Sequence, residues 1–243
     1  MPVYALEEIL TAVYAFASPA NKIGFIAADN LDASTGGKTD KITMCSGRFA
    51  IAVFGKSIPS RALQAIAAFE EYDNVISPTN LNDVLTQTWE LTKLLCDRHY
   101  SEKQAQKERG EVLDFDWMQF EHSSATLVIL DCRTYTIYEV EQKRLFPPDK
   151  IDQLAEVRPK ETDILHLSSL ADIAARRSCE TASFDDVEQV LSFVAKRIRK
   201  DQSVVPIIGD PGTIVIVCDG KITEHTTFNG PKDYIETCLE QMG

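Results

Sequence analysis

The segment Lys22-Ile-Gly-Phe-Ile-Ala-Ala-Asp29 is an apolar run that ends on an acidic residue. The run Thr11-Ala-Val-Tyr-Ala-Phe-Ala17 precedes it. After a polar loop at 30–39 come Lys41-Ile-Thr-Met-Cys45 and Arg48-Phe-Ala-Ile-Ala-Val-Phe-Gly55. Runs of four to eight apolar and β-branched residues between clusters of Pro, Asn, Gly and Asp are typical of strands joined by turns. We therefore expect residues 11–55 to form three or four strands.

Beyond residue 55 the chain alternates between helical and strand-like patterns. Apolar residues recur at a spacing of three to four in 81–95, which predicts a helix with one buried face. The strongly polar segment 100–116 either extends this helix or forms an exposed loop. Asp219-Gly220 between two apolar runs is a strong hairpin signal. The predicted helices are 60–71 with Ser60 as N-cap, 81–99, 170–177, 184–200 and 230–243, and the predicted strands are 125–131, 134–140, 163–169, 213–218 and 221–224.

Three short motifs occur in a characteristic order near the start of the chain. They are Ala27-Ala28-Asp29, Asp40-Lys41-Ile42 with the hairpin that follows, and Phe54-Gly55 leading into a helix. In this order the stretch resembles the opening of a proteasome-type subunit of the N-terminal-nucleophile (Ntn) hydrolase superfamily. The resemblance implies an α+β fold, a four-layer αββα sandwich of two antiparallel sheets flanked by helices. The resemblance covers most of the chain, and we expect residues 1–243 to form a single domain, with 1–10 as a propeptide or an N-terminal arm.

The composition is that of an ordinary globular protein, with 44% hydrophobic and 26% charged residues. A net charge of -12 argues against a nucleic-acid partner, because phosphate binding needs clustered Lys and Arg. The same negative charge argues against binding to an anionic membrane surface. No apolar run approaches the roughly 18 residues of a membrane span. The first residues lack the basic region of a signal peptide.

The six cysteines, Cys45, Cys96, Cys132, Cys179, Cys218 and Cys238, are scattered along the chain. None belongs to a C-x-x-C pair, so the spacing does not predict a zinc site. A chain of this length does not need disulfides to be stable. We therefore expect free thiols, a reducing cytoplasm, and no metal or cofactor.

The resemblance also implies a catalytic site. Amide hydrolysis in this family needs a free α-amino group beside the hydroxyl of the same residue, so that the amine acts as the base. Thr11 would be the nucleophile, Lys41 would lower the pKa of its hydroxyl, and Asp29 would hold Lys41. The N–H of Gly55 would stabilise the oxyanion. The candidate residues that the resemblance implies are Thr11, Asp29, Lys41, Gly55, Ser168 and Ser169.

The chain departs from the family pattern at three places. Leu10 precedes Thr11, where the family usually has Gly. The distance from Thr11 to Asp29 requires a first turn about two residues longer than usual, and without it Ala12 or Val13 would occupy the nucleophile position. The third departure is the short loop from Asp29 to Lys41. In the later serine cluster, Gly209-Asp210-Pro211-Gly212 also stands where the family has a Ser-Gly-Gly pattern.

Two functions remain open. The one that these departures favour is a non-catalytic or unprocessed subunit of a ring-shaped homo-oligomer. The other is a threonine-type peptidase or amidase that cleaves itself before Thr11 and takes a peptide substrate. An unrelated Ser or Cys enzyme on the same fold is a third, weaker interpretation. Each candidate residue also has a structural interpretation, in which Asp29 caps its strand, Lys41 pairs with it, and Thr11 is an ordinary β-branched strand residue.

Both interpretations of the site place Asp29 and Lys41 at adjacent strand ends. We therefore expect their charged atoms to lie within the roughly 4 Å limit of an ion pair.

Overall fold

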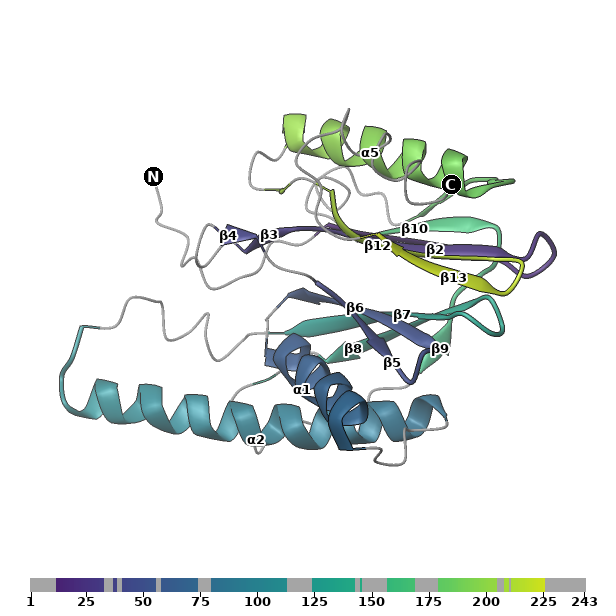
Figure 1. The fold of residues 1–243 in the computed structure, drawn as a ribbon. Helices are drawn as coiled ribbons and strands as arrows, with labels where there is room; N and C mark the ends of the chain where they lie inside the picture. The colour runs from purple at the N-terminus through teal and green to yellow at the C-terminus, as the bar shows by residue number, and fades with distance from the viewer. Residues whose placement is uncertain are drawn as a thin grey trace.

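A computed structural model of the protein describes residues 12–32, 37–38, 41–55, 58–73, 80–112, 124–142, 145, 157–168, 179–204, 208–209 and 211–225. Two antiparallel sheets stack face to face at the centre of the molecule, and helices cover both outer faces (Figure 1). The expected αββα sandwich is therefore confirmed. The expected helices at 170–177 and 230–243 and the arm at 1–10 lie outside the described residues.

One sheet has six strands in the order β11-β10-β1-β2-β12-β13, and the other has five in the order β5-β6-β7-β8-β9. Strands β3 and β4 form a separate two-stranded ribbon. The strands of the first sheet are β1 Val13–Ser18, β2 Ile23–Asp29, β10 Ile164–Ser168, β11 Cys179–Thr181, β12 Pro211–Cys218 and β13 Lys221–His225. Those of the second are β5 Ile42–Cys45, β6 Phe49–Gly55, β7 Ala125–Asp131, β8 Thr136–Gln142 and β9 Arg158–Pro159, and the ribbon is β3 Leu31–Asp32 and β4 Gly37–Lys38.

The hairpin of β1 and β2 sets the register of the first sheet. Val13 lies opposite Ala28 and Ser18 lies opposite Ile23, so a four-residue turn at 19–22 joins the two strands. The backbone N–H of Asp29 donates to the carbonyl of Ala12 at 3.1 Å, which continues the ladder by one residue. Ala12 therefore lies directly beside Asp29 at the end of the sheet.

Alternating side chains of β1 fill two different parts of the core, as the pleat of a strand dictates. Tyr14 and Phe16 face outward, toward helix α5 (Val187–Val204), whereas Val13 and Ala15 face the second sheet. Phe16 packs edge-on against Phe184 with ring centroids 4.9 Å apart. Both faces of β1 and β2 are buried, which explains why these two strands are almost continuously apolar.

Helices α1 (Ile58–Asp73) and α2 (Leu81–Glu108) cover the five-stranded sheet (Figure 1). Pro59 lies in the first turn of α1, where a missing N–H is tolerated, so the helix begins before Ser60. The prediction that Ser60 is the N-cap is therefore wrong. Asn80 caps α2, because its side chain accepts from the N–H of Asp83 at 3.0 Å.

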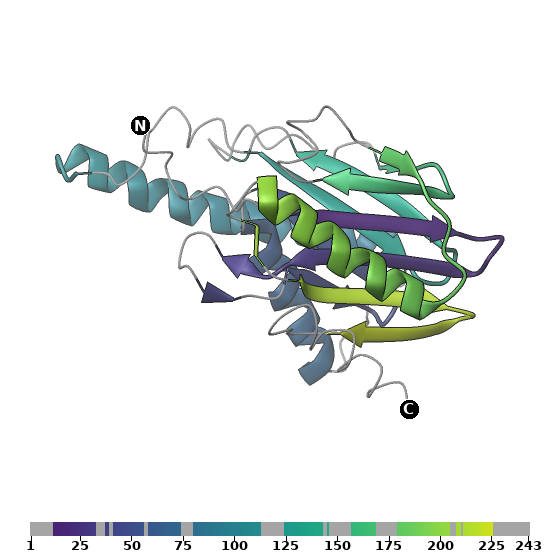
Figure 2. The same ribbon diagram turned by 90° about the horizontal axis from the view of Figure 1, so that it is seen from above.

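The polar segment after residue 99 extends α2, which was one of the two outcomes expected from the sequence. The fully buried side chains of α2 end at Cys96, and the segment 97–108 carries mostly charged and polar residues. This half of the helix projects beyond the two sheets in both views (Figure 2). In the described part of the chain, no helix is both long and apolar enough to cross a membrane.

Four short strand segments were not predicted from the sequence. They are β3 and β4, in what was expected to be a loop, and β9 and β11 at the edges of the two sheets. Each has two or three residues, which is too short to show the period-two alternation of a strand.

The cysteines that the structure describes are free thiols. Cys45, Cys96 and Cys132 are buried, whereas Cys179 is exposed. Burial raises the pKa of the Cys96 and Cys132 thiols to about 12, so these two side chains are neutral parts of the core at ordinary pH. Cys238 lies outside the described residues.

Arg48 and Asp131 form a two-point ion pair between neighbouring turns of the second sheet. Arg48 Nε lies 2.9 Å from Asp131 Oδ1, and Arg48 Nη2 lies 2.6 Å from Oδ2. Burial raises the pKa of the Asp131 carboxyl, but the hydrogen bonds from Arg48 and from the Arg133 N–H outweigh it and hold the pKa below its ordinary value. A carboxylate whose folded pKa is lowered stabilises the folded state above its unfolded pKa, which is about 3.9, and loses this contribution as the pH falls through the folded value.

Asp131→Asn should therefore lower the free energy of unfolding at pH 7 by roughly 1.5–3 kcal/mol, the range for a hydrogen bond to a charged group. The difference from the wild type should shrink as the pH falls below about 4. Urea unfolding at pH 7 and pH 3 measures both values. Glu102→Gln, in the exposed Arg98–Glu102 pair, is the control and should change little at either pH. An equal loss for Asp131→Asn at both pH values would contradict the role of the charge.

Candidate functional site

Asp29 and Lys41 form a buried ion pair where the ends of the two sheets meet. Asp29 is the last residue of β2, and Lys41 directly precedes β5. Lys41 Nζ lies 2.8 Å from Asp29 Oδ1, and the two side chains are 5% and 0% exposed. The expected proximity of these two residues is confirmed. Because a buried charge is stable only when it is paired and hydrogen-bonded, each of these side chains depends on the other.

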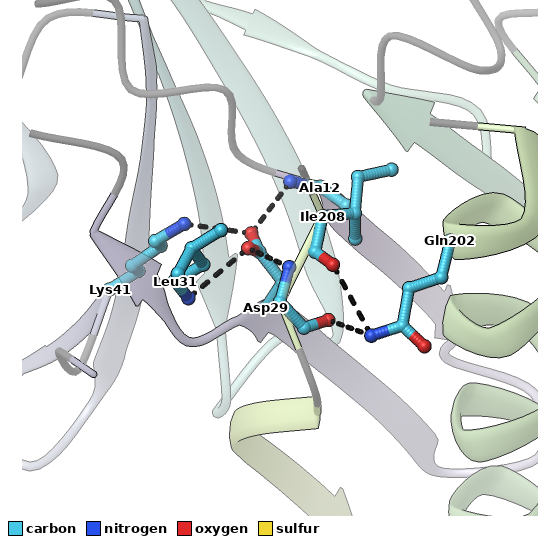
Figure 3. Close-up of polar contacts among 7 residues, drawn as sticks. Ala12, Asp29, Leu31, Lys41, Gln202 and Ile208 are labelled. Carbon is cyan, nitrogen blue, oxygen red and sulfur yellow. Dashed lines mark hydrogen bonds and ion pairs between the residues drawn. The ribbon is translucent and has the colours of Figure 1, made fainter. Parts of the chain in front are cut away.

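The carboxylate of Asp29 accepts hydrogen bonds from four donors (Figure 3). Oδ1 accepts from Lys41 Nζ at 2.8 Å and from the N–H of Ala12 at 2.8 Å. Oδ2 accepts from the N–H of Gly209 at 3.0 Å and from that of Leu31 at 3.3 Å. A carboxylate has about four lone-pair sites, so these donors occupy its full capacity. Asp29 is thus an anchor for the Lys41 ammonium and for three backbone N–H groups.

Ala12 connects this anchor to the start of β1. Its N–H bonds the same carboxylate oxygen that bonds Lys41, and its carbonyl accepts from the Asp29 N–H. The long turn at 19–22 keeps Ala12, rather than Val13, opposite Asp29. Thr11, which precedes Ala12 in the chain, lies outside the described residues.

Gly55 lies at the same end of the second sheet as Lys41. The register pairs Ile42 with Ala52, so the residues at the start of β5 lie beside the end of β6. Gly55 has a φ of +99°, and a Cβ at this position would lie 2.5 Å from the carbonyl oxygen of Ser124. Both facts require glycine, which allows a close approach of the backbone and leaves no side chain at this corner.

Ser168 ends β10, and its Cα pairs with that of Val13 on β1. The backbone of Ser168 is therefore at the same end of the first sheet as Ala12 and Asp29. Its side chain, and all of Ser169, lie outside what the structure describes. Of the six candidate residues, the structure brings Asp29, Lys41, Gly55 and the backbone of Ser168 to one end of the sandwich.

Two residues of this site were not identified from the sequence. Gly209 donates to Asp29, and Gln202 on α5 donates from Nε2 to the carbonyls of Ile208 at 3.2 Å and of Gly209 at 2.8 Å (Figure 3). The signal available in the sequence was Gly209-Asp210-Pro211-Gly212, which indicates a turn. No local pattern links this turn to an acidic residue 180 positions earlier.

The donor set of the site is suited to acid–base and electrostatic chemistry. A buried ammonium favours the ionised form of any hydroxyl that lies beside it. Within the part of the chain that the structure describes, no three His, Cys, Asp or Glu side chains gather into a group that could hold a metal ion.

A scan against protein-family models finds no match, and a search of the curated proteins finds none. Among solved structures, the chain is similar to a Gly-1 mutant of Anbu from Hyphomicrobium sp. strain MC1, with a TM-score of 0.50 and 9% sequence identity. The match covers 96% of this chain and 94% of that chain. Anbu is a proteasome-like subunit with the Ntn-hydrolase fold. At this identity the likeness shows the fold, so the chain has a proteasome-like Ntn-hydrolase fold.

Proposed function

We propose that this chain is the inactive, unprocessed form of a self-associating, proteasome-like threonine amide hydrolase, in which Thr11 becomes the nucleophile once residues 1–10 are removed. The observation that carries the proposal is the sharing of Asp29 Oδ1 between Lys41 Nζ and the N–H of Ala12. Through this shared oxygen, one carboxylate holds both the Lys41 ammonium and Ala12, the residue that follows Thr11.

In the processed form Thr11 carries a free α-amino group, a type of group that is partly neutral at physiological pH. The neutral amine takes the proton of the Thr11 hydroxyl as the oxygen attacks the substrate carbonyl. The Lys41 ammonium, held by Asp29, favours the developing alkoxide, and the N–H of Gly55 stabilises the oxyanion. The amine returns the proton to the leaving group, and water then hydrolyses the acyl ester.

The unprocessed chain lacks this chemistry because a peptide nitrogen is not a base. Leu10 at the bond before Thr11 is bulkier than the Gly usual in the family, which disfavours the tight geometry of self-attack. We therefore expect purified wild-type protein to retain residues 1–10. The test compares this protein with a chain that starts at Thr11, by intact mass and by hydrolysis of short peptide amides.

A non-catalytic ring subunit is the second candidate function, and one observation favours it. All four acceptor positions of Asp29 are used within the protein, as expected for a residue that only fixes strand ends. A chain that starts at Thr11, is folded, and hydrolyses no amide would support this candidate.

Self-association follows from either function. Leu94 on α2 is 63% exposed, and the charged half of the helix at 97–108 projects beyond the sheets (Figure 2). We expect light scattering to give a mass several times the 27.1 kDa of one chain at micromolar concentration. Leu94→Glu should reduce this mass, because it places a charge on the exposed apolar position of α2. The matched control Ile222→Glu, at an exposed position of β13, should leave it unchanged.

A monomer at all micromolar concentrations would contradict the self-association. An equal loss of mass in Leu94→Glu and Ile222→Glu would contradict the assignment of α2 to the interface.

A further inference from the structure

We propose that Gln202 is a positioning residue, which holds the Asp29–Lys41 pair in place through the backbone of Gly209. The chemical value of this positioning rests on the proposed function, but the contacts themselves do not. Gln202 lies outside all of the motifs that pointed to the site.

A short chain of hydrogen bonds leads from α5 to the carboxylate of Asp29. Gln202, in the last turn of α5, donates from Nε2 to the carbonyls of Ile208 and Gly209 at 3.2 and 2.8 Å. The N–H of Gly209 then donates to Asp29 Oδ2 at 3.0 Å (Figure 3). One side-chain amide therefore holds the carbonyls on either side of the N–H that bonds Asp29.

The backbone around Gly209 fits closely against the end of β2. A Cβ on Gly209 would lie 2.5 Å from the Leu31 nitrogen, and one on Gly212 would lie 2.7 Å from the Cβ of Asn30. The absence of a side chain on these two glycines thus allows their backbone to lie directly against Asn30 and Leu31. Because closely packed atoms have little room to adjust, a shift at Gly209 should move the end of β2 and with it Asp29.

The same turn of α5 supports the other oxygen of the carboxylate. Asp201 accepts a hydrogen bond from the hydroxyl of Tyr14 at 2.6 Å, and Arg197 Nε lies 3.4 Å from Asp201. Tyr14 is two residues from Ala12 on the same face of β1, and Ala12 donates to Asp29 Oδ1. The last turn of α5 therefore supports Oδ1 through β1 and Oδ2 through Gly209.

Loss of the Gln202 amide should first affect the bond between Gly209 and Asp29 Oδ2. When this donor is misplaced, Oδ1 keeps its two hydrogen bonds and Oδ2 loses the one from Gly209. The carboxylate group can then rotate. Lys41 Nζ bonds Oδ1, so its position should change with that rotation. The expected effect is a change in the position of Lys41, which precedes β5 of the five-stranded sheet, whereas Gly209 precedes β12 of the six-stranded sheet.

The test uses Gln202→Met in the full chain, because methionine has a similar length and no donor. The matched control is Gln189→Met on the first turn of the same helix, where the amide bonds Asp185 and Asp186. Gln202→Met should speed amide hydrogen exchange at Gly209 by roughly tenfold, the equivalent of one or two ordinary hydrogen bonds. It should also shift the NMR signal of the Lys41 ammonium, whereas Gln189→Met should change neither signal.

Unchanged exchange at Gly209 and an unchanged Lys41 signal would overturn the proposal, as would equal effects in the two variants. If Gln202→Met does not fold, Gln202→Glu serves instead, because its carboxylate keeps the shape of the amide and cannot donate at pH 7. In a chain that starts at Thr11, Gln202→Met should lower kcat by about tenfold with KM unchanged. If that chain is inactive with Gln202 intact, the proposed function fails, yet the Gly209 and Lys41 signals still decide the role of Gln202.

Discussion

Asp29→Ala is expected to lower the free energy of unfolding by about 3–5 kcal/mol, the range for removing one partner of a buried ion pair. The substitution leaves the Lys41 ammonium without its carboxylate in a site where it is 5% exposed. It also removes the acceptor of three backbone N–H groups, those of Ala12, Leu31 and Gly209. Unfolding in urea, at one fixed protein concentration because the protein is expected to self-associate, measures the loss.

Lys41→Met should be less harmful than Asp29→Ala, with a loss of roughly 1–3 kcal/mol. The remaining carboxylate keeps three N–H donors, and hydrogen bonds of this kind stabilise the charged form. Glu102→Ala, in the exposed pair with Arg98, should cost less than about 1 kcal/mol and is the control for the loss of a surface ion pair.

The double variant Asp29→Ala/Lys41→Met should be more stable than the sum of the two single losses predicts. Its two changes remove both charges together, and the stability losses of substitutions at residues in contact are not additive. A larger loss for Lys41→Met than for Asp29→Ala would contradict the view that Asp29 is the anchor of the site.

Much of this site could be predicted from the sequence because its residues lie at the ends of continuous apolar runs. Asp29 ends one such run and Lys41 begins another, so the chain itself marks both positions. Their proximity across two different sheets is not a local property. It was predicted from a resemblance in the order of motifs, and the structure confirms it.

The contacts of Gly209 and Gln202 could not be predicted in the same way. Gly209 acts through its backbone N–H, which is common to every residue except proline and leaves no mark on the sequence. Gln202 lies in an amphipathic helix, where a polar residue near the end is expected to face solvent. Only the fold places it beside the carbonyls of Ile208 and Gly209.

The start of α1 shows a similar limit at short range. Ser60 is a good N-cap residue, but Pro59 is also suited to a first turn, and the helix includes both. Ser60 and Pro59 thus predict different starts for α1. The packing of Leu63 and Ile58 against the second sheet agrees with the start at Ile58.

A chain produced to begin at Thr11 is expected to hydrolyse short peptide amides, whereas the full chain should show no such activity. Removal of residues 1–10 converts the Thr11 nitrogen from a peptide nitrogen into an amine, which is the base that the mechanism needs. Activity should rise with pH as this amine loses its proton, because only the neutral amine accepts a proton. Initial rates with fluorogenic peptide amides, together with intact mass of both proteins, measure these differences.

Variants of the chain that starts at Thr11 then separate the roles of its residues. Thr11→Ala should abolish hydrolysis, and Lys41→Met should lower the rate by roughly 10²–10⁴, the range for a positioned acid–base group. Thr134→Ala, in an exposed turn at the opposite end of the second sheet, is the control and should retain full activity. Hydrolysis that survives Thr11→Ala would place the nucleophile elsewhere. A folded, self-associated chain that begins at Thr11 and remains inactive would instead identify the Asp29–Lys41 pair as a structural anchor in a non-catalytic ring subunit.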